Sequence, residues 1–292
     1  MKNYLGLIFY LVIFEYFFCQ CNDGEVFLWE QCYSIDNTTQ IDLAGESLTG
    51  SIPPEIGELV NLLSLNLQAN QLSEEIPSEI GNLINLNILY LQNNNLLGVI
   101  PEEIGNLISL IELKLYSNQL SGEIPSEIGN LNYLTTLGLF NNQLSGEIPP
   151  EIGNLYNLNY LWLYNNQLSG EIPLEIGNLS SLTSLFLNDN NLSGEVPLEI
   201  GNLASINYLH LENNQLEGQL PISLGDLTNL NALIIKNNQF EGQIACTLCS
   251  LDIVWDNSYL FNAQNNFLCP PYPLCIEDVM SGQDTLGCGS LP

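Results

Sequence analysis

The chain has 292 residues, with 33 Asp and Glu, three Lys and no Arg, for a formal net charge of −30 at pH 7. This charge argues against nucleic acid and anionic lipid as partners, because both attract basic surfaces. Hydrophobic residues make up 46% of the chain, which is ample for a continuous core.

The first residues have the pattern of an export signal. Lys2 is followed by an apolar run from Leu5 to Phe18 that only Glu15 interrupts. This pattern predicts a signal peptide over residues 1–21. The run has about 14 residues, fewer than the roughly 20 that span a bilayer, which disfavours a membrane anchor.

The sequence leaves the cleavage site of the signal peptide undetermined. Cleavage before Asn22 would remove Cys21, whereas cleavage after Cys19 would keep it as a partner for Cys32. Lipidation of Cys21, as in a bacterial lipoprotein, is a third alternative, but the preceding residues lack the usual small-residue pattern.

Residues 22–51 are predicted to form an N-terminal cap. Ile41 and Leu43 lie 24 residues before leucines of the first regular repeat, whereas Glu46 stands where later repeats carry Asn. We expect Phe27 and Trp29 to cover the open end of the core.

Residues 52–243 form eight units of 24 residues without insertion or deletion. An Ile-Pro pair marks the register from Ile52 to Ile172, and it becomes Val196-Pro197 and Leu220-Pro221 in later units. A fixed period of this length predicts a solenoid, in which stacked units share one core and no unit is stable alone. The chain is therefore one elongated domain.

Each unit combines three local signals. In the sequence YLWLYNN, Leu161 and Leu163 alternate with Tyr160, Trp162 and Tyr164, which predicts a short strand and, by stacking, a parallel sheet. An inward amide after each strand can satisfy backbone groups at the turn. The segment PxEIGNL is too short for a full helix and predicts a 3₁₀-like turn. Eight asparagines form the predicted ladder: Asn70, Asn94, Asn118, Asn142, Asn166, Asn190, Asn214 and Asn238.

The frame LxxLxxLxLxxNxLxGxIPxxIG, over about residues 28–268, resembles the plant-type leucine-rich repeat. This type occurs in receptor-kinase ectodomains and in polygalacturonase-inhibiting proteins. The resemblance implies an α/β-type right-handed solenoid with parallel strands on the concave face and 3₁₀ or irregular turns on the convex face. It also implies a cysteine pair in the N-terminal cap, which Cys21 and Cys32 match if the signal is cleaved early.

Residues 244–292 are predicted to hold a last degenerate repeat and a cysteine-rich cap. The last strand slips by four residues, so that Asn266 becomes its ladder asparagine. In an exported protein, five cysteines predict two disulfides and one cysteine left over, without revealing the pairing. The caps of such solenoids carry disulfides, which disfavours a zinc or redox role for the CxxC pair. The five are Cys246, Cys249, Cys269, Cys275 and Cys288.

The outward strand positions form the sheet face, the concave side of such a solenoid, and they vary while the frame stays constant. Aromatic residues occupy this face in six consecutive repeats, and both lysines after Lys2 and the single histidine also fall there. Exposed aromatic rows often mark binding surfaces, although aromatics also stabilise sheets by stacking. The candidate binding residues are Tyr90, Lys114, Tyr116, Phe140, Tyr160, Trp162, Tyr164, Phe186, Tyr208, His210 and Lys236.

The acidic residues form two columns in register. A solvated acidic wall is the main interpretation, and loose Ca²⁺ binding is the alternative, because Ca²⁺ accepts several carboxylate oxygens. No loop of EF-hand type is present, so no specific metal site is predicted. The columns are Glu55, Glu79, Glu103, Glu127, Glu151, Glu175 and Glu199, and Glu123, Glu147, Glu171 and Glu195.

Enzymatic activity and a cofactor are not expected. With one histidine, no arginine and neither a GxSxG motif nor a phosphate-binding loop, little remains for catalysis. The pair His210 and Glu212 is more typical of a surface contact than of a catalytic dyad. Sequons at Asn37, Asn178 and Asn191 would permit glycosylation in a eukaryotic host.

The sequence therefore predicts a secreted or cell-surface protein that binds a protein, peptide or glycan, with recognition or defence as the role that the resemblance suggests. The alternative is a structural acidic rod of a surface layer or matrix, with loose divalent-cation binding. Ice binding is disfavoured, because the chain lacks threonine columns and carries bulky aromatics on the sheet.

Overall fold

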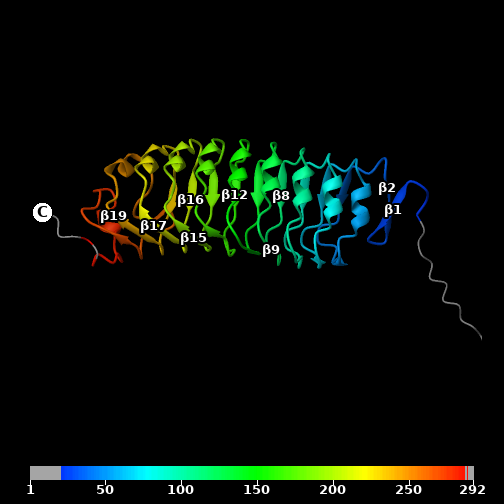
Figure 1. Ribbon diagram of the computed structural model, residues 1–292, viewed down its shortest axis with the longest axis horizontal. Helices are drawn as coiled ribbons and strands as arrows, with labels where there is room; N and C mark the ends of the chain where they lie inside the picture. The colour runs from blue at the N-terminus through cyan, green and yellow to red at the C-terminus, as the bar shows by residue number, and fades with distance from the viewer. Residues whose placement is uncertain (1–20, 287, 289–292) are drawn as a thin grey trace, which may run out of the picture.

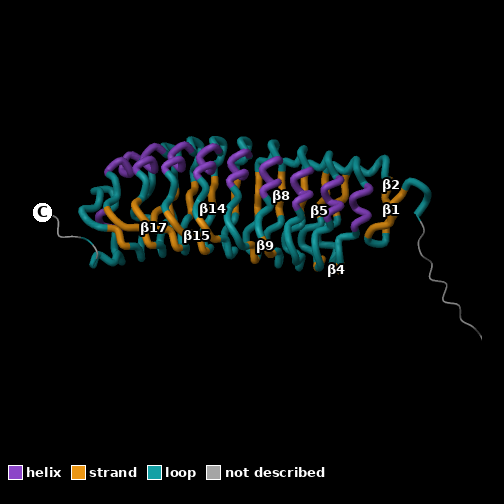
Figure 2. Tube along the Cα trace, viewed as in Figure 1, coloured by secondary structure: helices purple, strands orange, loops and turns teal. Residues whose placement is uncertain are grey.

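The computed structural model describes residues 21–286 and 288, so the predicted signal peptide, apart from Cys21, lies outside the described residues. The repeats stack into a long rod, with the first units at one end and the last units at the other (Figure 1). Strands line one side of the rod and short helices line another (Figure 2). The predicted leucine-rich-repeat solenoid is confirmed.

Ten short parallel strands form one continuous sheet. Leu161 points into the core while Tyr160 and Trp162 point outward, and Leu161 pairs in register with the leucines of the units before and after it. The strands are β3 (Gln40–Asp42), β5 (Ser64–Asn66), β7 (Ile88–Tyr90), β8 (Glu112–Lys114), β10 (Thr136–Gly138), β12 (Tyr160–Trp162), β14 (Ser184–Phe186), β16 (Tyr208–His210), β18 (Ala232–Ile234) and β20 (Phe261–Asn262).

One short 3₁₀ helix per unit covers the opposite side of the core, as predicted. Each regular helix follows a proline in extended conformation, such as Pro149 with φ −65°, because proline fits a helix start but not a central strand. The helices are η1 (Pro54–Glu58), η2 (Ser78–Asn82), η3 (Glu102–Asn106), η4 (Ser126–Asn130), η5 (Pro150–Asn154), η6 (Leu174–Asn178), η7 (Leu198–Asn202), η8 (Ile222–Asp226), η9 (Cys246–Ser250) and η10 (Glu277–Val279).

The backbones of neighbouring 3₁₀ helices approach each other closely, because each regular unit has glycine at the same helical position. A Cβ built on Gly153 would lie 2.5 Å from the carbonyl oxygen of Glu175 in the next unit. A second glycine, such as Gly170 with φ +76°, takes a left-handed conformation that other residues rarely adopt.

A further set of short parallel strands runs along the flank of the rod, and the sequence pattern does not predict it. Segments that follow the ladder asparagines pair with one another, as Ser169 does with Asn191 and Glu217 with Gln239. These strands are β4 (Thr49–Gly50), β6 (Gln71–Leu72), β9 (Ser121–Gly122), β11 (Gln143–Leu144), β13 (Ser169–Gly170), β15 (Asn191–Gly194), β17 (Gln215–Gln219), β19 (Gln239–Gly242) and β21 (Phe267–Leu268).

The asparagines of the ladder close the turn between the two sets of strands. The amide of Asn166 donates to the carbonyl oxygens of Leu139 at 3.1 Å and Leu163 at 3.0 Å, and its oxygen accepts from the backbone N–H of Leu144 at 3.1 Å. Asn70, Asn94, Asn118, Asn142, Asn190, Asn214 and Asn238 repeat this arrangement. Backbone groups that could not reach water are thereby satisfied.

An antiparallel hairpin of β1 (Glu25–Leu28) and β2 (Gln31–Ser34) closes the N-terminal end, and a disulfide joins Cys21 to Cys32. Trp29 packs against the core, but the prediction that Phe27 does so is wrong. Phe27 is 45% exposed, because strand alternation turns its neighbours Val26 and Leu28 inward instead.

The C-terminal end shows the predicted slip. Phe261 pairs with Leu233, which is 28 residues earlier, and the amide of Asn266 donates to the carbonyl oxygen of Ile235. Disulfides join Cys249 to Cys275 and Cys269 to Cys288. Cys246 is exposed and pairs with no cysteine that the structure describes.

Candidate functional site

The aromatic row of the sheet face has a stacked centre. The ring of Phe140 lies between Tyr116, at a centroid distance of 4.2 Å, and Tyr164, at 4.4 Å, and both pairs have an interplanar angle of 10°. Burial, with a contribution from nearby Tyr116, raises the pKa of Tyr164. These three side chains use much of their ring surface on one another, as expected for neighbours in a ladder.

Other aromatic side chains of the row are more exposed to solvent and could contact a ligand. Tyr160 is 42% exposed and Tyr208 is 44% exposed. Trp162 lies beside Gly138, and its Nε1–H donates to the hydroxyl of Ser184 at 3.2 Å. The ring centroids of Tyr160 and Trp162 are 5.3 Å apart, and the angle between the ring planes is 46°.

A polar cluster lies at the N-terminal end of the row. The hydroxyl of Tyr90 donates to the carboxylate of Glu112 at 2.5 Å, and Nζ of Lys114 donates to the same oxygen at 2.6 Å. The ammonium also lies 4.3 Å from the centre of the Tyr90 ring. Lys114 is therefore paired within the protein, and it is not the free cation that an anionic ligand would need.

The cluster shifts the pKa of each member. Burial opposes ionisation of Glu112, but the hydrogen bonds from Lys114 and Tyr90 and the charge of Lys114 outweigh it and lower its pKa. Burial also opposes the charge of Lys114, and its bonds to Glu112 and Tyr90 outweigh that effect and raise its pKa. Burial, followed by the hydrogen bond to Glu112, raises the pKa of Tyr90.

The other end of the row combines aromatic and charged groups. The ring of His210 lies 4.4 Å from that of Phe186, and its Nδ1 lies 3.6 Å from a carboxylate oxygen of Glu212. The second oxygen of Glu212 is buried and has no hydrogen-bond partner among the described residues. Lys236, half-buried in the next unit, makes no ion pair within the described part of the chain.

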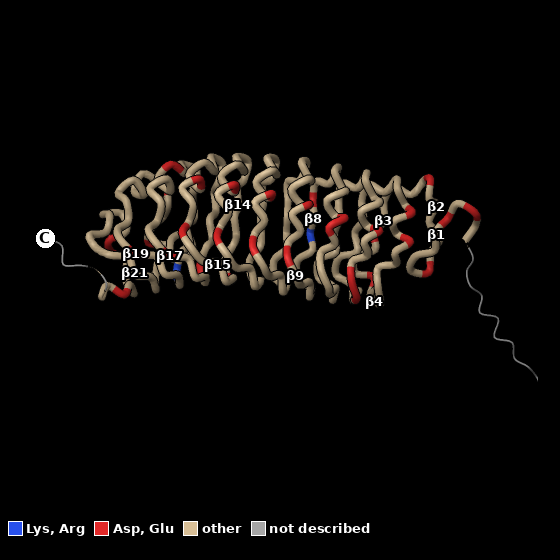
Figure 3. The backbone as a smooth tube through the Cα atoms, in the orientation of Figure 1, with Lys and Arg blue, Asp and Glu red and all other residues tan. Residues whose placement is uncertain are grey.

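Charges on the sheet face nearly balance. Asp42, Glu112 and Glu212 oppose Lys114 and Lys236, so three acids meet two lysines. Acidic residues dominate elsewhere, and the two lysines are the blue segments in Figure 3. The sheet face is thus close to neutral in a chain of net charge −30.

A second polar ladder was missed by the sequence analysis. The residue before each ladder asparagine has positive φ, such as Asn165 at 54° and Asn213 at 57°. These outer side chains also bond from unit to unit, for example Asn165 to Asn141 at 2.7 Å and Asn213 to Asp189 at 2.7 Å. The repeated Asn-Asn pair was the available signal, because asparagine tolerates the left-handed conformation better than most residues.

The two acidic columns flank a groove beside the helices. A shallow groove of about 1110 Å³ is lined by proline and isoleucine on its floor and by five glutamates. They are Glu102, Glu103, Glu123, Glu127 and Glu147. The Cγ atoms of Glu123 and Glu147 rest on Gly146 and Gly170 of the following units, so these side chains also help to pack the rod.

Other candidate positions are separate from the sheet face. Asn37, Asn178 and Asn191 are exposed. Cys21, Glu25 and Cys32 come close together, but both sulfurs belong to a disulfide and so cannot act as metal-binding thiolates. Within the described residues, no helix has the length and apolar character needed to cross a membrane.

Comparison with known proteins identifies relatives. A family model described as "Leucine-rich repeat region" matches residues 41–147 and 149–257. The plant peptide hormone receptor RGFR1 in complex with RGF2 is 38% identical, with a TM-score of 0.74, and the match covers 78% of this chain and 36% of the receptor chain. No curated protein sequence matches the chain significantly.

Two further solved structures are informative. The Arabidopsis receptor kinase HAESA ectodomain, in complex with an N-terminal extended IDA peptide hormone, is 35% identical, with a TM-score of 0.74 and coverage of 80% of this chain and 38% of that one. A plant ice-binding protein is 29% identical, with a TM-score of 0.67 and coverage of 86% and 78%. The chain thus spans less than half of either receptor ectodomain. With the family model matching most of the repeats, this chain belongs to the leucine-rich-repeat proteins of the plant type.

Proposed function

We propose that this protein is an exported binding module that recognises an extended peptide or protein segment along its sheet face, as part of recognition or defence. The observation that carries the proposal is the aromatic row from Tyr90 to Tyr208 on a nearly neutral face of a strongly acidic rod. Aromatic side chains supply large contact areas with few rotatable bonds. Near-neutrality lets a partner approach without the repulsion or attraction that the acidic columns impose.

The relatives support this proposal. RGFR1 and HAESA are described in complex with RGF2 and with the IDA peptide hormone. The stacked rings at Phe140 form a rigid floor, and the exposed Tyr160 and Trp162 next to it provide anchors. Such a row of in-register side chains suits a ligand that runs across several units rather than one that enters a closed cavity.

The test is a binding screen against secreted peptides, secreted hydrolases and cell-wall glycans. The test variant replaces Tyr160, Trp162 and Tyr164 by alanine. The matched control replaces Tyr133, Tyr156 and Tyr259, which are 65%, 56% and 86% exposed and lie outside the sheet strands. Circular dichroism checks that both variants fold.

We expect the wild-type and control proteins to bind one peptide or protein ligand saturably and the sheet-face variant to lose it. A saturable glycan ligand that depends on the same residues would retain the surface but change the ligand class. Equal binding by all three proteins would show that the aromatic row only packs the sheet.

Ice binding is a second candidate, favoured by the likeness to the plant ice-binding protein. The flank of the rod, rather than the sheet face, carries a regular uncharged column of exposed amides, in the flank strands or at the equivalent positions of other units. It comprises Gln71, Asn95, Gln119, Gln143, Gln167, Asn191, Gln215 and Gln239. Inhibition of ice recrystallisation that is lost when Gln143 and Gln167 become lysine would support this function, and absence of inhibition would exclude it.

A further inference from the structure

One edge of the rod carries no charge over six consecutive units. It is the turn that leads from the end of each 3₁₀ helix to the next strand of the main sheet. We call it the uncharged edge, and it comprises residues 82–87, 106–111, 130–135, 154–159, 178–183 and 202–207. Glu58 and Asp226, at the ends of η1 and η8, close it at either end. In a chain with 33 acidic residues, such a strip is a distinct surface.

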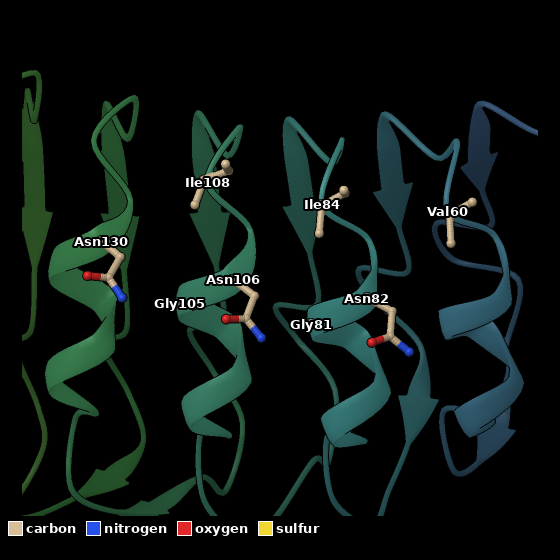
Figure 4. A pocket seen from close by; sticks show the side chains of 8 residues that line it. All are labelled: Val60, Gly81, Asn82, Ile84, Gly105, Asn106, Ile108 and Asn130. Atoms are coloured by element: carbon tan, nitrogen blue, oxygen red, sulfur yellow. The ribbon is translucent and has the colours of Figure 1, made fainter.

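The N-terminal part of this edge, together with the turn at residues 59–63 of the preceding unit, is also apolar. Five aliphatic side chains there are exposed, and we call them the apolar ridge: Val60 43%, Leu63 41%, Ile84 52%, Ile108 58% and Ile111 41%. Figure 4 shows Val60, Ile84 and Ile108 in a row above the helices. In the later units the position of Val60 holds Ser180, Ala204 and Thr228 instead.

A shallow hollow accompanies the ridge. It has a volume of about 690 Å³ and is lined by Val60, Ile84, Ile108 and the asparagines Asn82, Asn106 and Asn130, with Gly81 and Gly105 on its floor. The three asparagine side chains make no hydrogen bond with the described residues. The surface therefore offers apolar knobs, a recess beside them and unused amide donors and acceptors.

Three properties of this surface fit a second copy of the same chain. The acidic columns would repel another molecule of charge −30, so an identical partner can approach most closely where acids are few, and Glu58 is the one acid among residues 58–63, 82–87 and 106–111, which carry the ridge. Two copies share the same spacing between units, so side chains of one ridge can enter the recesses of the other at every unit. An amide has both a donor and an acceptor, so asparagine can pair with asparagine across a two-fold axis.

We propose that the apolar ridge is the interface of a homodimer, in which two rods pack antiparallel about a two-fold axis near Ile84. Val60 of one copy then meets Ile108 of the other, Asn82 pairs with Asn82 across the axis, and the amide of Asn106 faces the carboxylate of Glu58, which can accept a hydrogen bond from it. An isologous contact of this kind closes on itself and does not extend into a filament. The sheet face stays open in both copies, so dimerisation is separate from ligand binding.

The position of one sequon is compatible with this interface. Asn178 is exposed on the same edge, but four units away from Asn82. A glycan there would cover the later, more polar part of the edge and leave the ridge uncovered.

The experiment compares the oligomeric state of three proteins by light scattering and sedimentation velocity over a range of micromolar concentrations. The test variant is Ile84→Asp with Ile108→Asp. The matched control is Leu198→Asp with Ile222→Asp, which removes side chains of 63% and 62% exposure and adds the same charge on the helix side. We expect dimers for the wild type and the control, and dimerisation weakened roughly tenfold or more for the test variant. Because salt screens the repulsion between the acidic rods, it should strengthen the wild-type dimer.

A second measurement does not depend on the aspartate variants folding. Ile84→Cys is introduced into a Cys246→Ser background and oxidised, and a disulfide-linked dimer is expected because the two copies of residue 84 face each other. The proposal is overturned if the wild type is monomeric at every concentration, if both aspartate variants dissociate equally, or if oxidation yields no cross-linked dimer. Loss of peptide binding alone would affect only the function proposed above.

Discussion

Nζ of Lys114 lies 2.6 Å from a carboxylate oxygen of Glu112, and both side chains project from the same short strand. The relative exposures of the two side chains are 22% and 30%, so the pair is partly shielded from water. Tyr90 donates to the same oxygen from the neighbouring strand. The contact therefore ties adjacent units together.

Glu112→Gln should lower the free energy of unfolding at neutral pH by about 1 kcal/mol, because a charge-assisted bond is lost. The pKa of Glu112 lies below its ordinary value of 4.5, so this contribution is present above that value and disappears as pH falls through the folded-state pKa. The pKa of Lys114 lies above its ordinary value of 10.5, so the contribution is also lost as pH rises through that higher pKa.

Urea unfolding of the wild type and the Glu112→Gln variant at neutral and acid pH measures this effect. The difference between them should shrink in acid. A double-mutant cycle with Lys114→Met should show coupling at neutral pH, and additive effects would mean that the pair contributes nothing.

Replacing Asn166 by leucine should destabilise the rod by about 3 kcal/mol or more. The side chain satisfies backbone groups of Leu139, Leu163 and Leu144, and each unpaired buried group costs about 1–3 kcal/mol. Denaturant unfolding measures the loss. The control Gln167→Ala, at an exposed position, should stay within about 0.5 kcal/mol of the wild type, and a comparable loss in both variants would contradict the ladder's role.

Two glycine substitutions should separate close backbone packing from a looser contact with side chains. Gly153→Ala places a Cβ 2.5 Å from a backbone oxygen and should cost about 1–3 kcal/mol. Gly138→Ala places a Cβ 3.3 Å from a ring atom of Tyr116 and 3.6 Å from a ring atom of Trp162, both on side chains that can move, and should cost less. Thermal unfolding compares the stability of the two variants. A larger loss of stability for Gly138→Ala than for Gly153→Ala would contradict the prediction.

Sodium chloride should raise the melting temperature, because it screens repulsion along the two glutamate columns. Ca²⁺ at the same ionic strength should add no further increase if these columns form a solvated wall. A calcium-specific increase would instead favour bridging of carboxylates between neighbouring units, as in the alternative of a cation-binding structural rod.

The sequence predicts the repeated part of this fold well. The spacing of Leu161 and Leu185 predicts their pairing, and the shifted Asn266 predicts the slip of the last strand, because backbone register follows the period. Contacts that depend on individual neighbours are harder to predict. The pairing of Lys114 with Glu112, the outward turn of Phe27 and the close approach at Gly153 require knowledge of what lies opposite each residue. The flank strands were missed because segments such as residues 168–170 hold one core leucine followed by serine and glycine, and so lack the apolar alternation that marks the main strands.

The uniform period has a consequence for how this protein can change. Removing or duplicating any whole unit between Ile76 and Val196 would join residues that already occupy equivalent positions, so every new boundary would resemble an existing one. A point mutation in the core must be accommodated by its neighbours, whereas such a change in length leaves the local environments intact. Gain or loss of one whole repeat in the gene should therefore yield a folded protein. The length of the rod can thus vary more easily than its cross-section.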